Sequence, residues 1–178
     1  MIFSLLVFTI IIFDNTIIHP SAHSILLTCF LFSNVLPIIT LLFLQKKGII
    51  SDLDASIRQE RIMPLFLGVV YAVLGFLSLH IQEAGMLIKG LMFCTITNTI
   101  VIIIITQYWK ISIHTMGVSG LLSVLWIHGL EYPVIMLIIL LLVSTSRVIM
   151  KAHTIPQVTI GSLLGLILTL IQIHYFFI

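Results

Sequence analysis

The sequence is poor in charge. Only 8% of its 178 residues are Asp, Glu, Lys or Arg, whereas soluble domains carry about 25%. So few charges cannot cover the surface of a water-soluble fold, and 60% of the residues are hydrophobic. We therefore expect the bilayer to be the solvent for most of the chain. Nucleic-acid binding has no support, because no basic patch lies outside the apolar segments.

Cysteine is also scarce. Cys29 and Cys94 are the only two, and both fall within apolar runs, where a thiol behaves as a small hydrophobic side chain. We expect neither a disulfide nor a cysteine-based metal site, because the spacing typical of metal sites is missing. The N-terminal apolar stretch has no basic region before it, so we expect a retained span rather than a cleaved signal peptide.

Long apolar segments follow one another along the chain, and about 20 apolar residues are needed for a helix to cross a bilayer. No alternating barrel pattern is visible, so the spans should be helical. The sequence predicts an all-α membrane protein, a single domain over residues 1–178 built as a bundle of six to seven transmembrane helices. Asn34 and Pro37 are expected to kink the second span. The expected spans are 2–18, which is weak, 24–45, 64–80, 85–107, 112–128, 132–150 and 155–176.

The basic residues are distributed unevenly. If the spans alternate in direction, seven of the eight Lys and Arg residues lie at one face of the membrane, and Lys89 lies near the other. The positive-inside rule makes the basic face cytoplasmic, so we expect an integral protein of the cytoplasmic membrane. The seven residues are Lys46, Lys47, Arg58, Arg61, Lys110, Arg147 and Lys151.

The segment from Ser51 to Glu60 is the clearly polar part of the chain. Ser51 with Asp54 fits a capping box, and Asp54, Arg58 and Arg61 recur at helical spacing. We therefore predict a short interfacial helix near residues 51–61 that ends before Pro64.

Two histidines accompany the cations of the basic face. His114 follows Lys110, and His153 follows Arg147. Guanidinium groups bind phosphate with two hydrogen bonds, and a helix N-terminus adds backbone donors. An imidazole in such a place can attack phosphorus or carry a proton. The pattern therefore predicts an anion site with acid–base capacity, and phosphate is its natural ligand.

The clearest motif is Ser146-Arg147-x5-His153-x3-Gln157. It resembles the third motif of the PAP2 (type 2 phosphatidic acid phosphatase) superfamily of membrane lipid phosphatases, Ser-Arg-x5-His-x3-Asp, with Gln157 at the position of the Asp.

Two further segments extend the resemblance loosely over residues 46–165. Ser112-Ile113-His114 keeps the Ser and His of the second family motif, Pro-Ser-Gly-His. Arg58, Arg61 and Pro64 look like a rearranged form of the first motif, Lys-x6-Arg-Pro.

The resemblance implies a metal-independent phosphatase without a cofactor, acting on a lipid phosphomonoester or a prenyl diphosphate. It implies that His153 is the nucleophile and forms a phosphohistidine, and that His114 is the general acid. Gln157 would replace the carboxylate that orients the nucleophilic ring. The residues expected to bind the phosphate are Arg147, Arg58, Arg61, Ser112 and Lys110.

Other interpretations stay open. Thr154-x-x-Gln157 is itself a capping-box pattern, and Arg58 with Arg61 can form a solvated face that binds anionic lipid. Without a carboxylate at position 157, the chain can be a PAP2-like protein that binds lipid and has lost turnover. The acidic loop around Asp54 also resembles a loop of UbiA-like prenyltransferases. Those enzymes need two such loops to hold Mg²⁺-diphosphate, and only one is found on this face.

Overall fold

The computed structural model describes residues 22–177, and this part of the chain is helical, without strands. The first helix is continuous through α2 (Ala22–Phe30), a π-helical turn (Leu31–Val35) and α3 (Leu36–Lys46). It is followed by α4 (Ile62–Ile81), α5 (Met86–Thr106), α6 (Ile113–Ile127), α7 (Pro133–Ile149) and α8 (Ile155–Phe176). The predicted span 2–18, and with it the retained N-terminal span, lies outside the described residues.

Four helices of the described part are long and apolar enough to cross a membrane: Ala22–Lys46, Arg58–Ile81, Met86–Thr106 and Ile155–Phe176. The other two, α6 and α7, are apolar but have only 15 and 17 residues. The predicted all-helical architecture is confirmed, and the four long apolar helices indicate a membrane protein.

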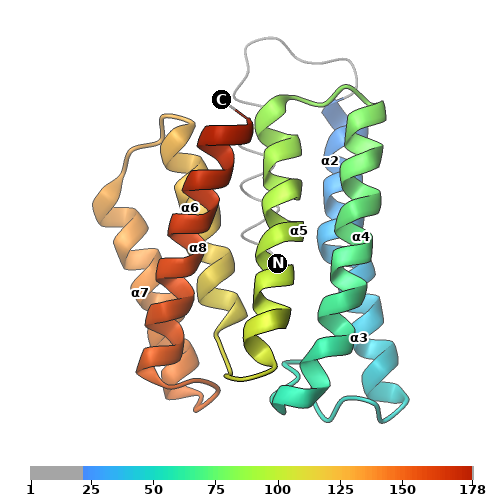
Figure 1. Ribbon diagram of the computed structural model, residues 1–178, viewed down its shortest axis with the longest axis vertical. Helices are drawn as coiled ribbons and strands as arrows, with labels where there is room; N and C mark the ends of the chain where they lie inside the picture. Colours follow the sequence, from blue (N-terminus) through green and yellow to red (C-terminus); the bar gives the residue numbers. More distant parts are fainter. Residues whose placement is uncertain (1–21, 178) are drawn as a thin grey trace.

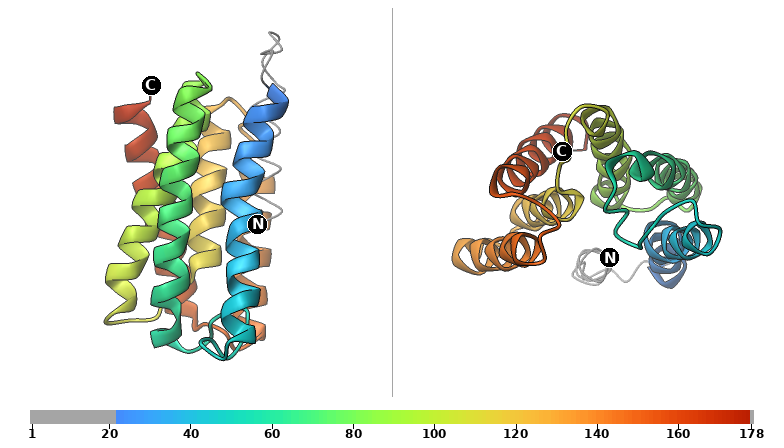
Figure 2. Two further views of the ribbon diagram at one scale, coloured as in Figure 1. Left: turned by 90° about the vertical axis from the view of Figure 1, so that its right-hand side faces the viewer. Right: turned by 90° about the horizontal axis from the view of Figure 1, so that it is seen from below.

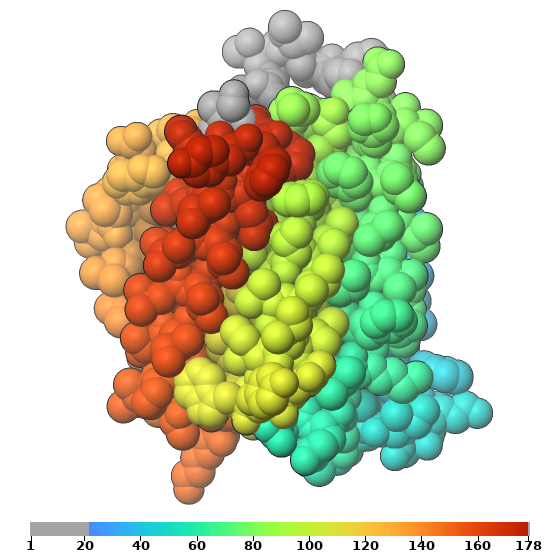
Figure 3. Space-filling model, viewed as in Figure 1, coloured from blue at the N-terminus to red at the C-terminus, as the bar shows by residue number. Residues whose placement is uncertain are grey.

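The helices run alternately up and down, so that the loops 47–57, 107–112 and 150–154 meet at one end of the bundle (Figure 1). Seen along their axes, the helices follow an arc from α2 and α3 through α4, α5, α8 and α6 to α7 (Figure 2). On the face shown in Figure 3, the side chains of α4, α5 and α8 pack side by side along the bundle. This alternation brings the three basic segments together, as the span count predicts.

The first helix contains the interruption that Asn34 and Pro37 lead one to expect. The Leu36 N–H bonds to the Leu31 carbonyl, one residue further back than in an α-helix, and Pro37 follows directly. Proline has no N–H to continue the α-helical pattern. A wider π turn is one of the established ways in which a helix accommodates such a break.

Close packing between α6 and α8 positions the start of α8. A Cβ on Gly161 would lie 2.8 Å from the Ser112 carbonyl oxygen, and one on Gly165 would lie 2.1 Å from that of Met116. Only glycine therefore allows the two backbones to approach this closely, as the Gly161-x-x-x-Gly165 spacing indicates. The same contact sets the loop before α8 against the first turn of α6.

The predicted interfacial helix near residues 51–61 is wrong. The Ser51 N–H and hydroxyl both donate to Glu60 at 2.8 Å, so Ser51 does not cap a helix. The Asp52 carboxylate instead accepts the Ser56 N–H at 3.2 Å, and Ala55 has a φ of 45°. These contacts fold residues 51–57 into an irregular loop, because long-range bonds to Glu60 replace the local capping that the spacing suggested.

Helical structure resumes in a 3-10 turn, Arg58–Arg61, which runs directly into α4. Pro64 consequently lies in the first turn of α4 and does not end a helix. A proline is tolerated there, since the N–H groups of a first turn have no partner within the helix.

Candidate functional site

Arg61 is a buried cation held by backbone carbonyls. Its side chain is 3% exposed. Its Nε donates to the Ala55 carbonyl at 2.8 Å, and its Nη1 donates to the Ile111 carbonyl at 3.1 Å. Within residues 22–177 it makes no ion pair with a carboxylate. Asp54 and Asp52 act on it only through space. A buried charge without a directly bonded counter-ion is costly, so this position favours an anionic ligand.

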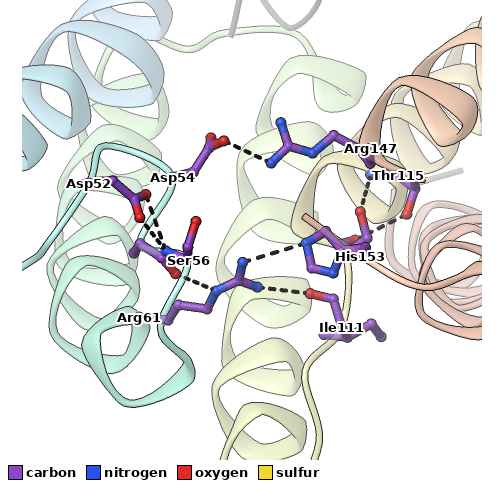
Figure 4. Close-up of polar contacts among 10 residues, drawn as sticks. Asp52, Asp54, Ser56, Arg61, Ile111, Thr115, Arg147 and His153 are labelled. Carbon is purple, nitrogen blue, oxygen red and sulfur yellow. Dashed lines mark hydrogen bonds and ion pairs between the residues drawn. The ribbon is translucent and has the colours of Figure 1, made fainter. Parts of the chain in front are cut away.

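His153 lies beside Arg61 and is also buried. Its Nε2 is 3.5 Å from Arg61 Nη2 (Figure 4). Its Nδ1 is 3.1 Å from Gln157 Oε1. The Thr154 N–H donates to the same Oε1 at 3.2 Å, which identifies that atom as the carbonyl oxygen. Because an oxygen of this kind only accepts, His153 Nδ1 carries the proton in the neutral ring. The Nε2 lone pair is therefore directed at Arg61.

Burial lowers the pKa of His153 to about 4, and the nearby charges of Arg61, Lys110 and Arg147 act in the same direction. The hydrogen bond to Gln157 opposes them without restoring the usual value. His153 is therefore neutral at pH 7, the state in which an imidazole is a nucleophile.

Gln157 serves both of the roles that its position suggested. It forms a capping box with Thr154 at the start of α8, and its side-chain oxygen also orients the ring of His153. One atom accepts both hydrogen bonds, so the capping and the orientation of the ring depend on each other.

Arg147, at the end of α7, is 7% exposed. Its Nη2 donates to Asp54 Oδ2 at 3.0 Å, while its buried Nε finds no partner in the described part of the structure. Burial acts to raise the pKa of Asp54, but the hydrogen bond and charge of Arg147 outweigh it, so that the pKa is lowered. Asp54 is therefore an anion at neutral pH, and it occupies one edge of a guanidinium that has a further donor to offer.

His114 occupies the first turn of α6 and lines a cavity with Asp54 and Arg61. It lies within electrostatic range of Asp54. Among the described contacts none joins His114 to His153; the two histidines share Arg61, which faces the cavity and also contacts the His153 ring. Lys110 is half-buried near the same group, and burial followed by the charge of Arg61 lowers its pKa.

Two predicted phosphate ligands have other structural roles. Ser112 is fully buried, and its hydroxyl caps α6 by accepting the Thr115 N–H at 3.4 Å. Arg58 donates through Nη1 to the Gln107 carbonyl at 3.0 Å. The structure thus brings together Arg61, His153, Gln157 and Arg147, with His114 and Lys110 nearby, and directs Ser112 and Arg58 to backbone groups.

The carboxylates of the first loop do not contact His153. Asp52 accepts the Ser56 N–H, Glu60 accepts from Ser51, and Asp54 pairs with Arg147. Gln157 is therefore the described side chain that bonds the Nδ1 edge of the ring. Sequence reasoning missed the pairing of Asp54 with Arg147 and the two carbonyls that hold Arg61. The left-handed turn at Ala55, which directs one of these carbonyls, has no glycine or asparagine to indicate it.

A largely apolar cavity of about 450 Å³ leads away from Arg61 into the bundle. Its volume lies within the range of small-molecule sites. It is lined by side chains of the first helix, α4, α5 and α6, and its charged residues, Asp54 and Arg61, lie at the loop end. A second, polar hollow is lined by Asp52, Lys110 and Lys151 among others, and Asp54 borders both spaces.

The chain matches no family model, no curated protein and no solved structure. Within the described residues, the site combines a neutral imidazole whose Nε2 faces Arg61, a buried guanidinium that is bonded to no carboxylate, and a second guanidinium with one buried donor that has no partner.

Proposed function

We propose that this protein is an integral membrane phosphatase, a divergent member of the PAP2 superfamily, that removes phosphate from a lipid phosphomonoester or a prenyl diphosphate. In this proposal the six described helices all cross the bilayer, and the loops that carry the site face the cytoplasm. The observation that carries the proposal is the pairing of His153 Nε2 with Arg61 Nη2. A nucleophile and a phosphoryl-binding cation then lie side by side in a buried site.

The reaction proceeds in two displacements. The His153 Nε2 lone pair attacks phosphorus, the bond between phosphorus and the lipid oxygen breaks, and His114 gives that oxygen a proton. Arg61 and Arg147 stabilise the charge on the phosphoryl oxygens. Water then attacks the phosphohistidine and loses its proton to His114, the N–P bond breaks, and inorganic phosphate leaves. With a diphosphate substrate, the leaving group of the first step is a lipid monophosphate.

The Asp54–Arg147 pair supports this assignment. The Asp54 carboxylate marks a place where Arg147 accepts an anion, 3.0 Å from Nη2. A phosphoryl group carries more oxygens than a carboxylate, so it can bond both Nη2 and the unpartnered Nε. Substrate binding would therefore displace Asp54 and satisfy the remaining buried donor.

Gln157 favours a second candidate function, lipid binding without turnover. An amide can orient the His153 ring, but it cannot stabilise an imidazolium as a carboxylate does; an amide in place of the carboxylate of a serine-protease triad costs about 10⁴-fold in kcat. A UbiA-like prenyltransferase has less support. Asp52 and Asp54 bond to different partners, a backbone N–H and Arg147, and among the described residues no group of three His, Cys, Asp or Glu side chains could hold a metal ion.

Phosphate release from lipid phosphates and prenyl diphosphates, measured with EDTA present, tests the proposal. We expect release by the wild type, and its loss in His153→Ala. His174→Ala is the matched control, because His174 lies in the last turn of α8, at the opposite end of the bundle. Equal rates of phosphate release by the wild type and by His153→Ala would refute the assignment of His153 as the nucleophile.

The same assay separates the alternatives. Gln157→Asp should raise turnover if the chain is an enzyme, since a carboxylate stabilises the charged imidazole. Lipid binding without release in either form would identify the binding protein, whereas prenyl transfer that EDTA abolishes would identify the transferase.

A further inference from the structure

We infer that the cavity beside Arg61 holds one hydrocarbon chain of the phosphorylated lipid, and that Gly68 and Ala72 of α4 set the length of chain that fits. The inference rests on the proposed function for the position of the phosphate, at Arg61. Both residues line the cavity, and neither takes part in the proposed chemistry.

The cavity has one charged end and an apolar body. Asp54, Arg61 and His114 lie at the loop end, and the remainder of the wall is formed mainly by aliphatic and aromatic side chains. Among them are Phe32, Ile38, Leu41, Leu65 and Ile113. A ligand with an anionic head and an apolar chain is complementary to such a wall.

The few hydroxyl groups on the wall already have partners. Thr95 donates to the Leu91 carbonyl at 2.9 Å, and Thr99 donates to the Thr95 carbonyl at 2.6 Å. Ser33 is 3.8 Å from the sulfur of Met92. Because these donors are occupied, the body of the cavity needs no polar ligand, and burying a hydrocarbon chain there leaves no hydroxyl donor unsatisfied.

The positions of the lining residues along the helix give an approximate length for the cavity. Along the helical segment Arg58–Ile81 the lining extends from Arg61 to Ala72, a backbone distance of about 16 Å at 1.5 Å per residue. An extended chain advances about 1.2 Å per bond, so about 14 bonds fit between the backbone levels of Arg61 and Ala72. Gly68 lies one helical turn nearer to Arg61, about 10 Å or nine bonds from it by the same geometry.

Gly68 leaves that part of the cavity open. A Cβ built on it meets no atom within 4 Å, and the residue lines the cavity. A side chain at this position can therefore start toward the space of the ligand without a clash at its Cβ. Gly117 of α6 provides a matched control, because its Cβ is equally unobstructed and it does not line this cavity.

The test is competition binding to the full-length protein in detergent, with single-chain alkyl phosphates of six to eighteen carbons displacing a fluorescent alkyl phosphate. For wild type and Gly117→Leu we expect affinity to rise with length and level off near 14 carbons. For Gly68→Leu the affinity should level off near nine carbons. Since each buried methylene contributes about fourfold, the 14-carbon phosphate should bind at least tenfold more weakly to Gly68→Leu, while the eight-carbon phosphate is unaffected.

All three proteins are measured in the same detergent, so partitioning of the longer alkyl phosphates into detergent micelles affects them equally and cancels in the comparison. Identical length profiles for Gly68→Leu and Gly117→Leu would overturn the inference, and so would failure of the wild type to bind any alkyl phosphate. Phosphate release is measured separately. If the dependence of affinity on chain length shifts in Gly68→Leu but the wild type releases no phosphate, the binding site for the hydrocarbon chain is supported and the proposed phosphatase activity is refuted.

Discussion

At the scale of single residues, the balance of buried charge decides what the site can bind. Arg61 is held by two carbonyls and a neutral ring, and Arg147 has one carboxylate and one unpartnered donor. Within residues 22–177, two buried guanidinium groups have a single carboxylate directly bonded to them, which leaves a net positive pair. An anion therefore gains more here than at an exposed pair, where solvent screens the attraction.

Asp54→Asn tests whether the carboxylate competes with the ligand for Arg147. The amide carries no charge, so an incoming phosphate no longer has to displace an anion. We expect inorganic phosphate to bind about two- to fivefold more tightly, the range that a partly exposed ion pair can contribute. The measurement is inhibition of phosphate release by added phosphate at pH 7.

The control for that experiment is Asp52→Asn, because Asp52 bonds the Ser56 backbone N–H and no arginine. Weaker phosphate binding in Asp54→Asn, with Asp52→Asn unchanged, would mean that Asp54 holds Arg147 in place instead of competing with the ligand.

Residues close in sequence were the ones that could be predicted. The spacing from Arg147 to His153 and Gln157 predicts one group on the loop between two helices, and a capping box predicts the partner of Thr154. Asp54 and Arg147 are 93 positions apart, and Arg61 bonds carbonyls whose direction depends on the path of two loops. Such contacts follow from tertiary packing, so no local pattern indicates them.

At the scale of elements, the helices were predictable to within two residues at each end, because apolar runs end at polar turns and prolines. The structure of the segment 51–61 was not predictable in this way. Its Asp and Arg residues recur at helical spacing, but Ser51 bonds Glu60, and Arg61 turns inward to bond the Ala55 carbonyl. Tertiary contacts of this kind override a weak local preference.

Among the contacts between helices, the one between α6 and α8 leads to a specific prediction about stability. Gly165→Ala places a Cβ against the Met116 carbonyl, so the helices must separate. Overpacking of this kind costs about 1–3 kcal/mol. We expect a lower midpoint of thermal unfolding in detergent and, since the loop before α8 shifts with the helix, slower phosphate release.

Gly117→Ala on α6 is the control, because its Cβ meets no atom within 4 Å. If both variants unfold at the wild-type temperature, the close approach of α6 and α8 does not stabilise the fold.

At the scale of the whole molecule, the alternation of the helices places the loops 47–57, 107–112 and 150–154 at one end of the bundle (Figure 1). Seven cations and both proposed catalytic histidines lie in or next to these loops. In the proposed transmembrane arrangement, this end would meet the headgroups, and the apolar cavity would extend toward the midplane. The arrangement explains why a chain with so few charges keeps most of them in three short loops or in the helical turns next to these loops.

Labelling of single cysteines tests this orientation. Lys47→Cys lies at the basic end and Glu83→Cys in the turn between α4 and α5 at the other, each in a protein with Cys29 and Cys94 replaced by alanine. We expect an impermeant reagent to label position 47 only from the cytoplasmic side and position 83 only from the opposite side. Labelling of both from one side would disprove the transmembrane arrangement.

The most direct test of the central claim is to look for phosphate on His153 itself. Wild-type protein is mixed with a lipid phosphate labelled in its phosphoryl group, quenched in alkali within the first turnover, and digested for mass spectrometry. The account predicts a phosphorylated peptide modified at His153, and none from His153→Ala. Turnover of the lipid phosphate by the wild type with no phosphohistidine at this position, or equal turnover by His153→Ala, would contradict it.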